Sequence, residues 1–381
     1  MVASISGFAT SFALVIAGLQ AVGATDAEAS SGLLVLCVTT AATSMVLAWY
    51  YRMPISTAWS TPGAALLVAA GIDDANFASA VGAFILCGVL IVVCGWWPAL
   101  GGLITRIPTP LASAMLAGIL FPICLAPVTA MIEVPALAWP ILLTWLVLFR
   151  LAPRWAVPAA MVVAGVVIAM SSGSEWLHSA SIAPQLTFVA PVFDAVLMVS
   201  LGLPLFIVTM AGQNVPGVVV MKTFGYDIPT RSALVGTGLG TAAGAFFGGH
   251  AINLAAITAA IMASPEAHPD KAKRWVASFS AGIGYLLLGL GAGVATALVS
   301  AAPTILIIAV AGLAVLGALI TSISSALETP RHRIEAIVTF LVTASGITIA
   351  GIGSPLWGLL TGAVLMLWLG GGKRPSRARG A

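Results

Sequence analysis

The sequence predicts an all-α membrane protein with about fourteen transmembrane segments, arranged as two inverted repeats of seven. Hydrophobic residues make up 60% of the 381 residues and charged residues only 7%, whereas a soluble domain carries about a quarter charged residues. The apolar residues run in long stretches that Pro, Gly and charged residues interrupt, and the basic residues fall in alternate interruptions. A chain of this composition and pattern crosses a bilayer many times.

The interruptions divide the chain into fourteen apolar segments. A spanning helix needs about 20 apolar residues, so the third and tenth segments are short for complete helices. A single residue separates the last two segments. In chain order, the predicted segments are 5–24, 30–51, 54–71, 76–98, 108–126, 134–150, 154–172, 192–213, 229–247, 249–264, 273–299, 302–324, 332–350 and 352–370.

The distribution of charge supports this count and orients the chain. With fourteen segments, both termini lie on the same side of the membrane, and the tail on that side carries Lys373, Arg374, Arg377 and Arg379. All the other Lys and Arg residues fall in connections on the same side, whereas the opposite connections receive only acidic residues. Because basic residues mark cytoplasmic connections, we expect both termini to be cytoplasmic.

A shift of the chain by 193 residues aligns features of its two halves. The shift places Gln20 on Gln213 and Ser60 on Asn253. Each half then holds seven segments, and this odd number makes the second repeat enter the membrane from the opposite face. Inverted repeats of this kind place the substrate site near the midplane, between the halves. The expected units are a first repeat at 1–190, an inverted second repeat at 191–372 and a basic cytoplasmic tail at 373–381.

The third and tenth segments are predicted to be broken, each with an extended half followed by a short helix. In the third segment Ser60 and Thr61 come just before Pro62 and an Ala/Leu-rich stretch, and in the tenth Asn253 stands before a similar stretch. Ser, Thr and Asn are strong N-cap residues, and Pro is favoured at the first helical position. Two helix N-termini facing one cavity would form an anion site without Lys or Arg, whether or not the capping side chains also contact substrate.

Four further residues are candidates to line the same site. Gln20 and Gln213 are neutral amides within or at the end of apolar segments, where they either contact substrate or form hydrogen bonds between helices. Trp59 either stacks on an aromatic substrate or packs in the protein interior. Asn214 lies just before a Val-Pro-Gly sequence, which predicts that the eighth segment ends or unwinds there.

Apart from His332, the first residue of the thirteenth segment, His250 is the only histidine within a predicted span, and it lies at the break of the tenth segment. A titratable group inside the membrane is a functional candidate, and imidazole exchanges protons near neutral pH. His250 is therefore a candidate for proton coupling; the alternative is a neutral side chain that bonds backbone freed by the break. The sequence offers no metal-ligand spacing, no catalytic constellation and no basic patch for nucleic acid. An enzyme is thus disfavoured, and no cofactor is expected.

Three motifs carry a resemblance to a known family. They are PISTAWSTPGAALL at 54–67, AGQNVPG at 211–217 and FGGHAINLA at 247–255. With them the chain resembles the benzoate:proton symporter family of bacterial inner-membrane transporters over essentially its whole length. The resemblance extends to nucleobase and anion transporters with seven-plus-seven inverted repeats. It implies a core domain (segments one to four and eight to eleven) that moves against a gate domain (five to seven and twelve to fourteen), and it is compatible with a homodimer.

The resemblance and the residues together favour a multi-pass inner-membrane importer of an aromatic carboxylate, with benzoate as the first candidate. The carboxylate would lie between Ser60, Thr61 and Asn253, and the ring against Trp59. The coupled proton would be carried by His250 or by the substrate itself. Nucleobase carriers of the wider group use acidic residues in segments eight and ten, which this chain lacks at the matching positions. The alternatives are an exchanger or channel for another organic or inorganic anion, or a nucleobase carrier.

Overall fold

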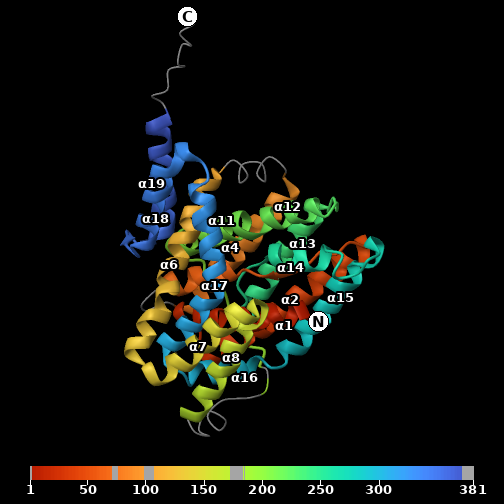
Figure 1. The fold of residues 1–381 in the computed structure, drawn as a ribbon. Coiled ribbons are helices and arrows are strands. Elements are labelled where there is room, and N and C mark those ends of the chain that lie inside the picture. The colour runs from red at the N-terminus through yellow and green to blue at the C-terminus, as the bar shows by residue number, and fades with distance from the viewer. Residues whose placement is uncertain (1, 71–75, 98–106, 172–182, 184, 371–381) are drawn as a thin grey trace, which may run out of the picture.

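A computed structural model describes residues 2–70, 76–97, 107–171, 183 and 185–370 (Figure 1). The predicted tail at 373–381 lies outside the described residues. The first half is helical except for one short strand. Its elements are α1 (Val2–Ala21), α2 (Asp26–Tyr51), β1 (Thr57–Trp59), α3 (Thr61–Ala70), α4 (Phe77–Trp96), α6 (Thr109–Glu133), α7 (Pro135–Leu151) and α8 (Pro153–Ser171).

The second half repeats this pattern of helices around one short strand and adds a small hairpin. Its first elements are α10 (Ala195–Leu197), the π-helical turn η1 (Met198–Gly202), α11 (Leu203–Thr209), the π-helical turn η2 (Met210–Asn214), α12 (Val215–Thr223), α13 (Thr230–Ala245), β2 (Ile252–Leu254) and α14 (Ala256–Ala263). There follow the 3-10 turn η3 (Lys271–Lys273), α15 (Trp275–Gly289), α16 (Ala292–Ser300), α17 (Thr304–Leu327), the 3-10 turn η4 (Pro330–His332), α18 (Arg333–Ala344), β3 (Thr348–Ile349), β4 (Ile352–Gly353) and α19 (Ser354–Gly370).

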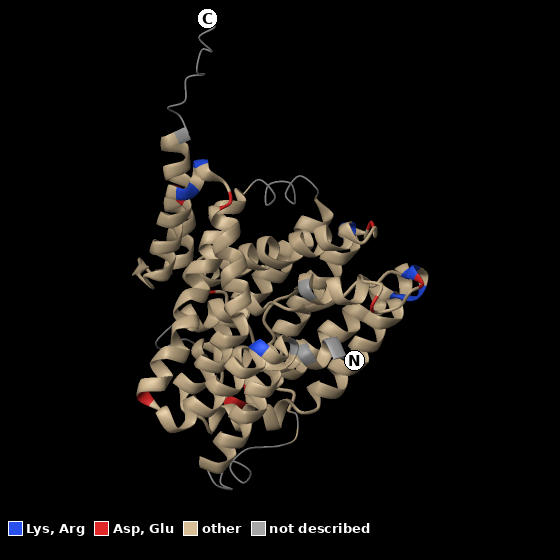
Figure 2. Cartoon of the chain, in the orientation of Figure 1, with Lys and Arg blue, Asp and Glu red and all other residues tan. Residues whose placement is uncertain are grey.

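The described helices are those of a multi-pass membrane protein. Five of them are long and apolar enough to cross a membrane, and α15 with α16 forms a sixth if the pair, bent by 55°, is one span. Five shorter apolar helices accompany them. Figure 2 shows charged residues at helix ends and connections, while the lengths of the helices carry almost none. Length and composition thus establish a polytopic helical fold, and the count of fourteen segments stays a prediction.

The predicted end of the eighth segment is wrong. A continuous helical stretch runs from Ala195 to Thr223, through α10, η1, α11, η2 and α12. The π-helical turns η1 and η2 end two residues before Pro204 and Pro216, respectively. Because a proline ring clashes with the carbonyl four residues earlier and offers no N–H, a widened turn lets the helix continue past it. The sequence signal for unwinding therefore marks a local π turn.

Other boundaries also differ from the prediction. The thirteenth segment ends as α18 at Ala344, not at 350. The fifth segment continues as α6 to Glu133, beyond the predicted end at 126, with Pro122 and Pro127 inside the helix. The eleventh segment is divided into α15 and α16, which meet at a 55° bend near Gly291. The predicted break between the last two segments is confirmed, because the hairpin β3–β4 separates α18 from α19.

The two broken segments meet as a pair of antiparallel strands in the protein interior. In the register of β1 and β2, Thr57 pairs with Leu254, Ala58 with Asn253 and Trp59 with Ile252. Two further backbone bonds flank the ladder, from Ser60 N to Ala251 O (2.8 Å) and from Ala255 N to Ser56 O (3.0 Å). Extended backbone inside a membrane needs hydrogen-bond partners that lipid does not supply. Each broken segment supplies these hydrogen bonds to the other.

Helices from the two halves pack together around this strand pair. α2 packs on α15, α4 on α13 and α6 on α17. At the α4–α13 contact, a Cβ on Gly238 would lie 2.7 Å from the carbonyl oxygen of Gly88. The glycines of α13 therefore serve close helix packing. α18 packs against both α6 and α19, and Figure 1 shows these three helices side by side at one edge of the molecule.

Candidate functional site

A cavity of about 240 Å³ lies beside the strand pair, where both broken segments become helical. α3 contributes Thr61 at its N-terminus, and α14 contributes Ala256 and Thr258 from its first turn. The remaining wall comes from α1, β1, the turn η2, α15 and α17. This is the arrangement that the sequence predicts, two helix N-termini beside one cavity. Among its lining residues are Ser11, Trp59, Thr61, Gln213, Thr258 and Tyr285.

Ser60 caps α3, as predicted. Its Oγ accepts a hydrogen bond from the backbone N–H of Gly63 (3.0 Å) in the first turn, the geometry of a serine N-cap. The same oxygen lies 3.0 Å from the Thr209 hydroxyl, which donates to it. Ser60 is fully buried and does not line the cavity. Its neighbour Thr61 does, and the Thr61 hydroxyl has no hydrogen-bond partner within the described part of the chain.

Asn253 does not cap α14, and this part of the prediction is wrong. The helix begins at Ala256, and its N-cap residue, Ala255, has no side chain that could accept a hydrogen bond. Asn253 instead lies within β2 and is fully buried. With its amide oriented to suit both neighbours, it accepts from Ser60 N (3.3 Å) and donates to Leu254 O (2.9 Å). Asn253 thus stabilises the end of the strand pair. The N–H groups in the first turn of α14 have no side-chain cap.

Gln213 and Asn214 sit together in the turn η2 but point to different partners. Gln213 lines the cavity. Asn214 is buried, and its Oδ1 accepts a hydrogen bond from Leu254 N (2.8 Å) at the end of β2. The π turn therefore holds the end of β2 through Asn214 and places the Gln213 amide at the cavity.

Trp59 forms the aromatic wall of the cavity. Its indole N–H donates to Ser11 Oγ (2.9 Å), and its ring meets Tyr285 edge-on with centroids 5.5 Å apart. The sequence analysis missed Ser11, Thr258 and Tyr285. A single tyrosine within a long apolar segment was an available signal for Tyr285, because a phenol in a membrane interior needs a polar partner. Nothing in the sequence separates the other two residues from ordinary helix positions.

Gln20 lies in a different cavity from Gln213. The Gln20 amide donates to Asp26 Oδ1 (2.8 Å) and to Ser300 Oγ (3.0 Å). These residues border a cavity of about 540 Å³ between α1, α16 and α17. The expectation that the two repeat-related glutamines line one cavity is therefore not met.

His250 comes two residues before β2 and packs against α4. Its side chain is fully buried, and its ring meets Phe84 of α4 edge-on with centroids 6.4 Å apart. Neither ring nitrogen makes a hydrogen bond of good geometry to any described residue, so a bond from His250 to freed backbone is not observed there. His250 does not line the 240 Å³ cavity.

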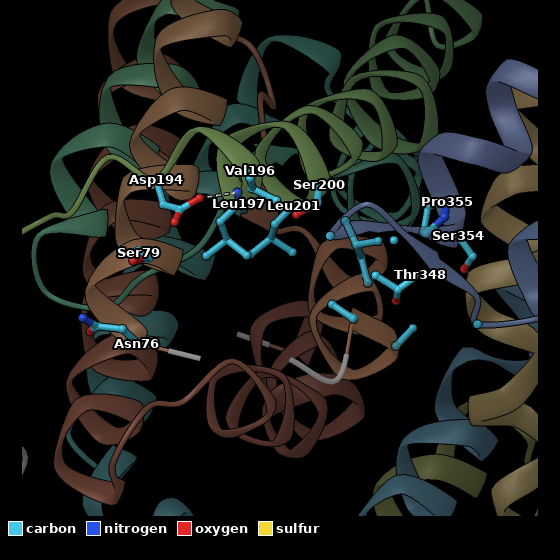
Figure 3. A pocket seen from close by; sticks show the side chains of 16 residues that line it. Asn76, Ser79, Asp194, Val196, Leu197, Ser200, Leu201, Thr348, Ser354 and Pro355 are labelled. Carbon is cyan, nitrogen blue, oxygen red and sulfur yellow. Dashed lines mark hydrogen bonds between the residues drawn. The ribbon is translucent and has the colours of Figure 1, made fainter. Parts of the chain in front are cut away.

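A third cavity, of about 490 Å³, borders the far end of α3 and the start of α4 (Figure 3). The turn η1 and the hairpin β3–β4 complete it, and Ser200 and Ser354 add hydroxyls. Asp194 lines this cavity, and its Oδ1 accepts from Leu197 N (2.9 Å), so it caps the helix that follows. Asp194 therefore lies apart from the cavity at the helix N-termini.

The chemistry of the 240 Å³ cavity is that of hydrogen-bond donors beside apolar walls. Among the described residues, no Lys, Arg, Asp, Glu or His borders it. Elsewhere in the described ranges, no group of three or more His, Cys, Asp and Glu could hold a metal ion. Hydroxyls, an amide and helix amides around an aromatic surface suit a small ligand with a negatively charged group.

A polytopic helical fold with two broken segments around such a cavity is typical of membrane transporters. The comparison with known families agrees, because the family described as benzoate membrane transport protein (BenE) matches residues 1–367. The chain belongs to this family, whose members are membrane transporters and not enzymes. The resemblance found in the three sequence motifs is thereby confirmed.

Two curated relatives extend this result. The chain is 43% identical over 359 residues to the inner membrane protein YdcO of Escherichia coli (strain K12), covering 94% of this chain and 91% of the relative. It is 34% identical over 325 residues to the benzoate membrane transport protein of Acinetobacter baylyi, covering 84% of this chain and 82% of the relative. Both are similar over most of their length.

Solved structures share the fold at low sequence identity. The transmembrane domain of the cyanobacterial bicarbonate transporter BicA superposes with a TM-score of 0.62 at 17% identity, covering 95% of this chain and 97% of that one. SLC26A9 superposes with a TM-score of 0.60 at 15% identity, covering 97% of this chain and 64% of that one. These likenesses establish a transporter fold of the BicA and SLC26 type.

Proposed function

We propose that the protein takes up benzoate or a similar aromatic carboxylate across the bacterial inner membrane, coupled to protons. The observation that carries the proposal is the 240 Å³ cavity, which combines donors from two helix N-termini with an aromatic wall and no ionised side chain. An aromatic carboxylate matches both halves of this chemistry. The name of the Acinetobacter relative points to the same substrate.

In the proposed binding mode, the carboxylate lies between Thr61 and the first turn of α14, and the ring lies against Trp59 and Tyr285. Gln213 donates from the side. Three buried residues support the site without lining the cavity, because their hydrogen bonds hold the strands and the cap of α3 in place. They are Ser60, Asn253 and Asn214. Gln20 belongs to the neighbouring 540 Å³ cavity.

The architecture in this proposal is a seven-plus-seven inverted repeat, at 1–190 and 191–372, with core and gate domains. The helix pairs support it. An exchange of the two repeats converts the contact of the second with the eleventh segment (α2–α15) into that of the ninth with the fourth (α13–α4). The same exchange leaves two contacts unchanged. They are the contact of the fifth with the twelfth segment (α6–α17) and the pairing of the two strands. Alternating access then follows from movement of the core against the gate.

Both termini are proposed to be cytoplasmic, because the basic residues lie in connections on one side of the fourteen segments. A homodimer belongs to the same proposal. Cysteine labelling of the tail from each side of sealed vesicles tests the orientation, and mass measurement of the purified protein tests the dimer.

The coupled proton has two candidate carriers, His250 and the substrate carboxyl group. Burial of His250 among apolar neighbours means that a proton reaches it only when the core rearranges. A substrate that carries its own proton needs no such step. Uptake by His250→Gln distinguishes the two, since only the first carrier makes the pH dependence of uptake depend on this residue.

The test of function is uptake of labelled benzoate into proteoliposomes that contain the purified protein, with and without an inward proton gradient. Saturable uptake that rises with the gradient supports the proposal. Uptake that ignores the gradient refutes proton coupling. Absence of benzoate uptake by folded protein refutes the substrate.

A second candidate is transport of another anion, because the donor-lined cavity also suits a small inorganic anion. Two proteins of similar structure, BicA and murine Slc26a9, are a bicarbonate transporter and an anion transporter. Competition of bicarbonate, chloride and non-aromatic carboxylates against benzoate tests it. Exchange without net flux would indicate an exchanger, unsaturable flux a channel, and competition by uracil a nucleobase carrier.

A further inference from the structure

The cavity of about 240 Å³ at the helix N-termini has a second group of polar side chains, which the proposed binding mode of benzoate does not use. The first group comes from the starts of α3 and α14 and from the turn η2, and consists of Thr61, Thr258 and Gln213. The second group comes from α1 and α15, and consists of Thr10, Ser11 and Tyr285. The unsubstituted ring of benzoate would lie against the hydroxyls of the second group without forming a hydrogen bond to any of them.

Ser11 presents a hydrogen-bond acceptor to the cavity and no proton. Its hydroxyl donates to Gly7 O (2.9 Å), and its oxygen accepts from the indole N–H of Trp59 (2.9 Å). Because a hydroxyl has one proton and two acceptor lone pairs, one lone pair of Ser11 Oγ is left for a ligand. The neighbouring Thr10 hydroxyl also donates its proton to Gly7 O (3.1 Å). The α1 wall of the cavity therefore suits a ligand group that donates a hydrogen bond.

The Tyr285 hydroxyl lies on the same side of the cavity, next to Gly7. A Cβ on Gly7 would lie 2.6 Å from Tyr285 Oη, so the glycine allows the phenol to approach α1. The Tyr285 side chain is buried, and its hydroxyl has no hydrogen-bond partner within the described part of the chain. A buried phenol hydroxyl needs a polar partner. Tyr285 Oη can both donate and accept, and it stands beside an oxygen of Ser11 that can only accept.

Trp59 connects the two polar groups of the cavity. Its backbone lies in β1, two residues before Thr61 begins α3, and its indole nitrogen reaches Ser11 on α1. A flat ring that lies along Trp59, with its carboxylate at the start of α3, therefore directs its opposite edge toward Ser11 and Tyr285. The volume of about 240 Å³ suits a ligand with a single ring, because pockets for drug-sized ligands begin at about 300 Å³.

We propose that the preferred substrate is an aromatic carboxylate with a hydroxyl group at the ring position opposite the carboxylate, as in para-hydroxybenzoate. The phenolic hydroxyl of the substrate donates to Ser11 Oγ and accepts from the Tyr285 hydroxyl. The inference rests on the proposed function and narrows its substrate class. A site that bonds a substrate hydroxyl discriminates against the analogue that lacks it, because polar groups of the site are then left unpaired.

The test is calorimetric titration of the purified full-length protein in detergent micelles with benzoate and three substituted benzoates. Para-hydroxybenzoate should bind roughly tenfold more tightly than benzoate, because it gains two neutral hydrogen bonds. Para-methylbenzoate, which has a substituent of similar size and no polar atom on it, should bind less tightly than para-hydroxybenzoate. Ortho-hydroxybenzoate, whose hydroxyl lies beside the carboxylate, should show no gain over benzoate.

Two substitutions test the partners of the substrate hydroxyl. Tyr285→Phe removes one partner and Ser11→Ala the other, so each should lower the ratio of the affinities for para-hydroxybenzoate and benzoate by roughly threefold or more. The ratio is the informative quantity, because a general effect on folding or on Trp59 changes both affinities alike. Tyr226→Phe is the matched control. Its hydroxyl donates to Lys271 O (2.9 Å) and does not border the cavity, so this variant should keep the wild-type ratio.

The outcomes separate this inference from the proposed function. A wild type that binds benzoate or para-methylbenzoate as tightly as para-hydroxybenzoate overturns the inference and leaves the proposed function intact. A preference that persists unchanged in Tyr285→Phe or in Ser11→Ala also overturns the inference, as does its loss in Tyr226→Phe. A folded wild type that binds none of these carboxylates overturns both.

Discussion

Replacing Thr61 by Val most directly tests the cavity of about 240 Å³ at the helix N-termini, here called the central cavity. Valine keeps the shape of the side chain at the start of α3 and removes one hydroxyl that borders the cavity and has no protein partner among the described residues. A hydrogen bond to a charged group contributes about 1.5–3 kcal/mol. At about 1.4 kcal/mol per factor of ten, Thr61→Val should weaken benzoate binding roughly ten- to a hundredfold. Calorimetric titration of the purified protein measures this change.

Thr40→Val is the matched control for this substitution. Thr40 is fully buried in α2, its hydroxyl has no hydrogen-bond partner in the described part of the chain, and it does not border the central cavity. The control should bind benzoate as the wild type does and should be no less stable, because it removes a buried hydroxyl that makes no bond. Wild-type affinity in folded Thr61→Val would refute the assignment of the carboxylate to the N-terminus of α3.

Three further predictions concern stability and coupling. Ser60→Ala removes the cap of α3 and leaves the Thr209 hydroxyl unpaired, so it should lower the free energy of chemical unfolding by about 2–4 kcal/mol. Adding Thr209→Val should restore about 1 kcal/mol or more of this free energy. No recovery would contradict the hydrogen bond between Thr209 and Ser60. His250→Gln should flatten the pH dependence of benzoate uptake if His250 carries the proton, and an unchanged profile in proteoliposomes assigns the proton to the substrate. Gly238→Ala places a Cβ 2.7 Å from a backbone carbonyl of α4 and should lower the melting temperature, whereas Gly317→Ala, with no atom within 4 Å, should not.

Local sequence predicted one half-helix well and the other poorly, for a physical reason. The cap of α3 depends on Ser60 and on the residues that follow it within one turn, so a local motif suffices. The start of α14 depends on the strand pairing, because Asn253 is held in β2 by bonds across to the other broken segment. A residue's capping propensity does not reveal such a partner far away in the sequence.

The repeat alignment paired Gln20 with Gln213, but it did not reveal that the two glutamines border different cavities, of about 540 Å³ and 240 Å³. In the proposed inverted repeat, equivalent positions lie on opposite sides of the midplane, so equivalence in the repeat does not require a shared site. The π turns were also beyond the sequence analysis. Each π turn forms because the helix continues past a proline two residues later. Whether the helix continues or ends there depends on the packing around Pro204 and Pro216, which the local sequence does not show.

The two cavities that the proposed repeat relates have unequal volumes, and this bears on the proposed transport cycle. The cavity between α1 and α17 has a volume of about 540 Å³. Its counterpart between η2 and α6, around Gly212 and Ser113, has a volume of about 110 Å³. In the proposed inverted repeat, two halves packed alike against their gate helices would border cavities of similar size, so the proposal assigns the difference in volume to a difference in that packing. Alternating access in this proposal is an exchange of the two packings, while the hydrogen bonds between β1 and β2 stay within the core.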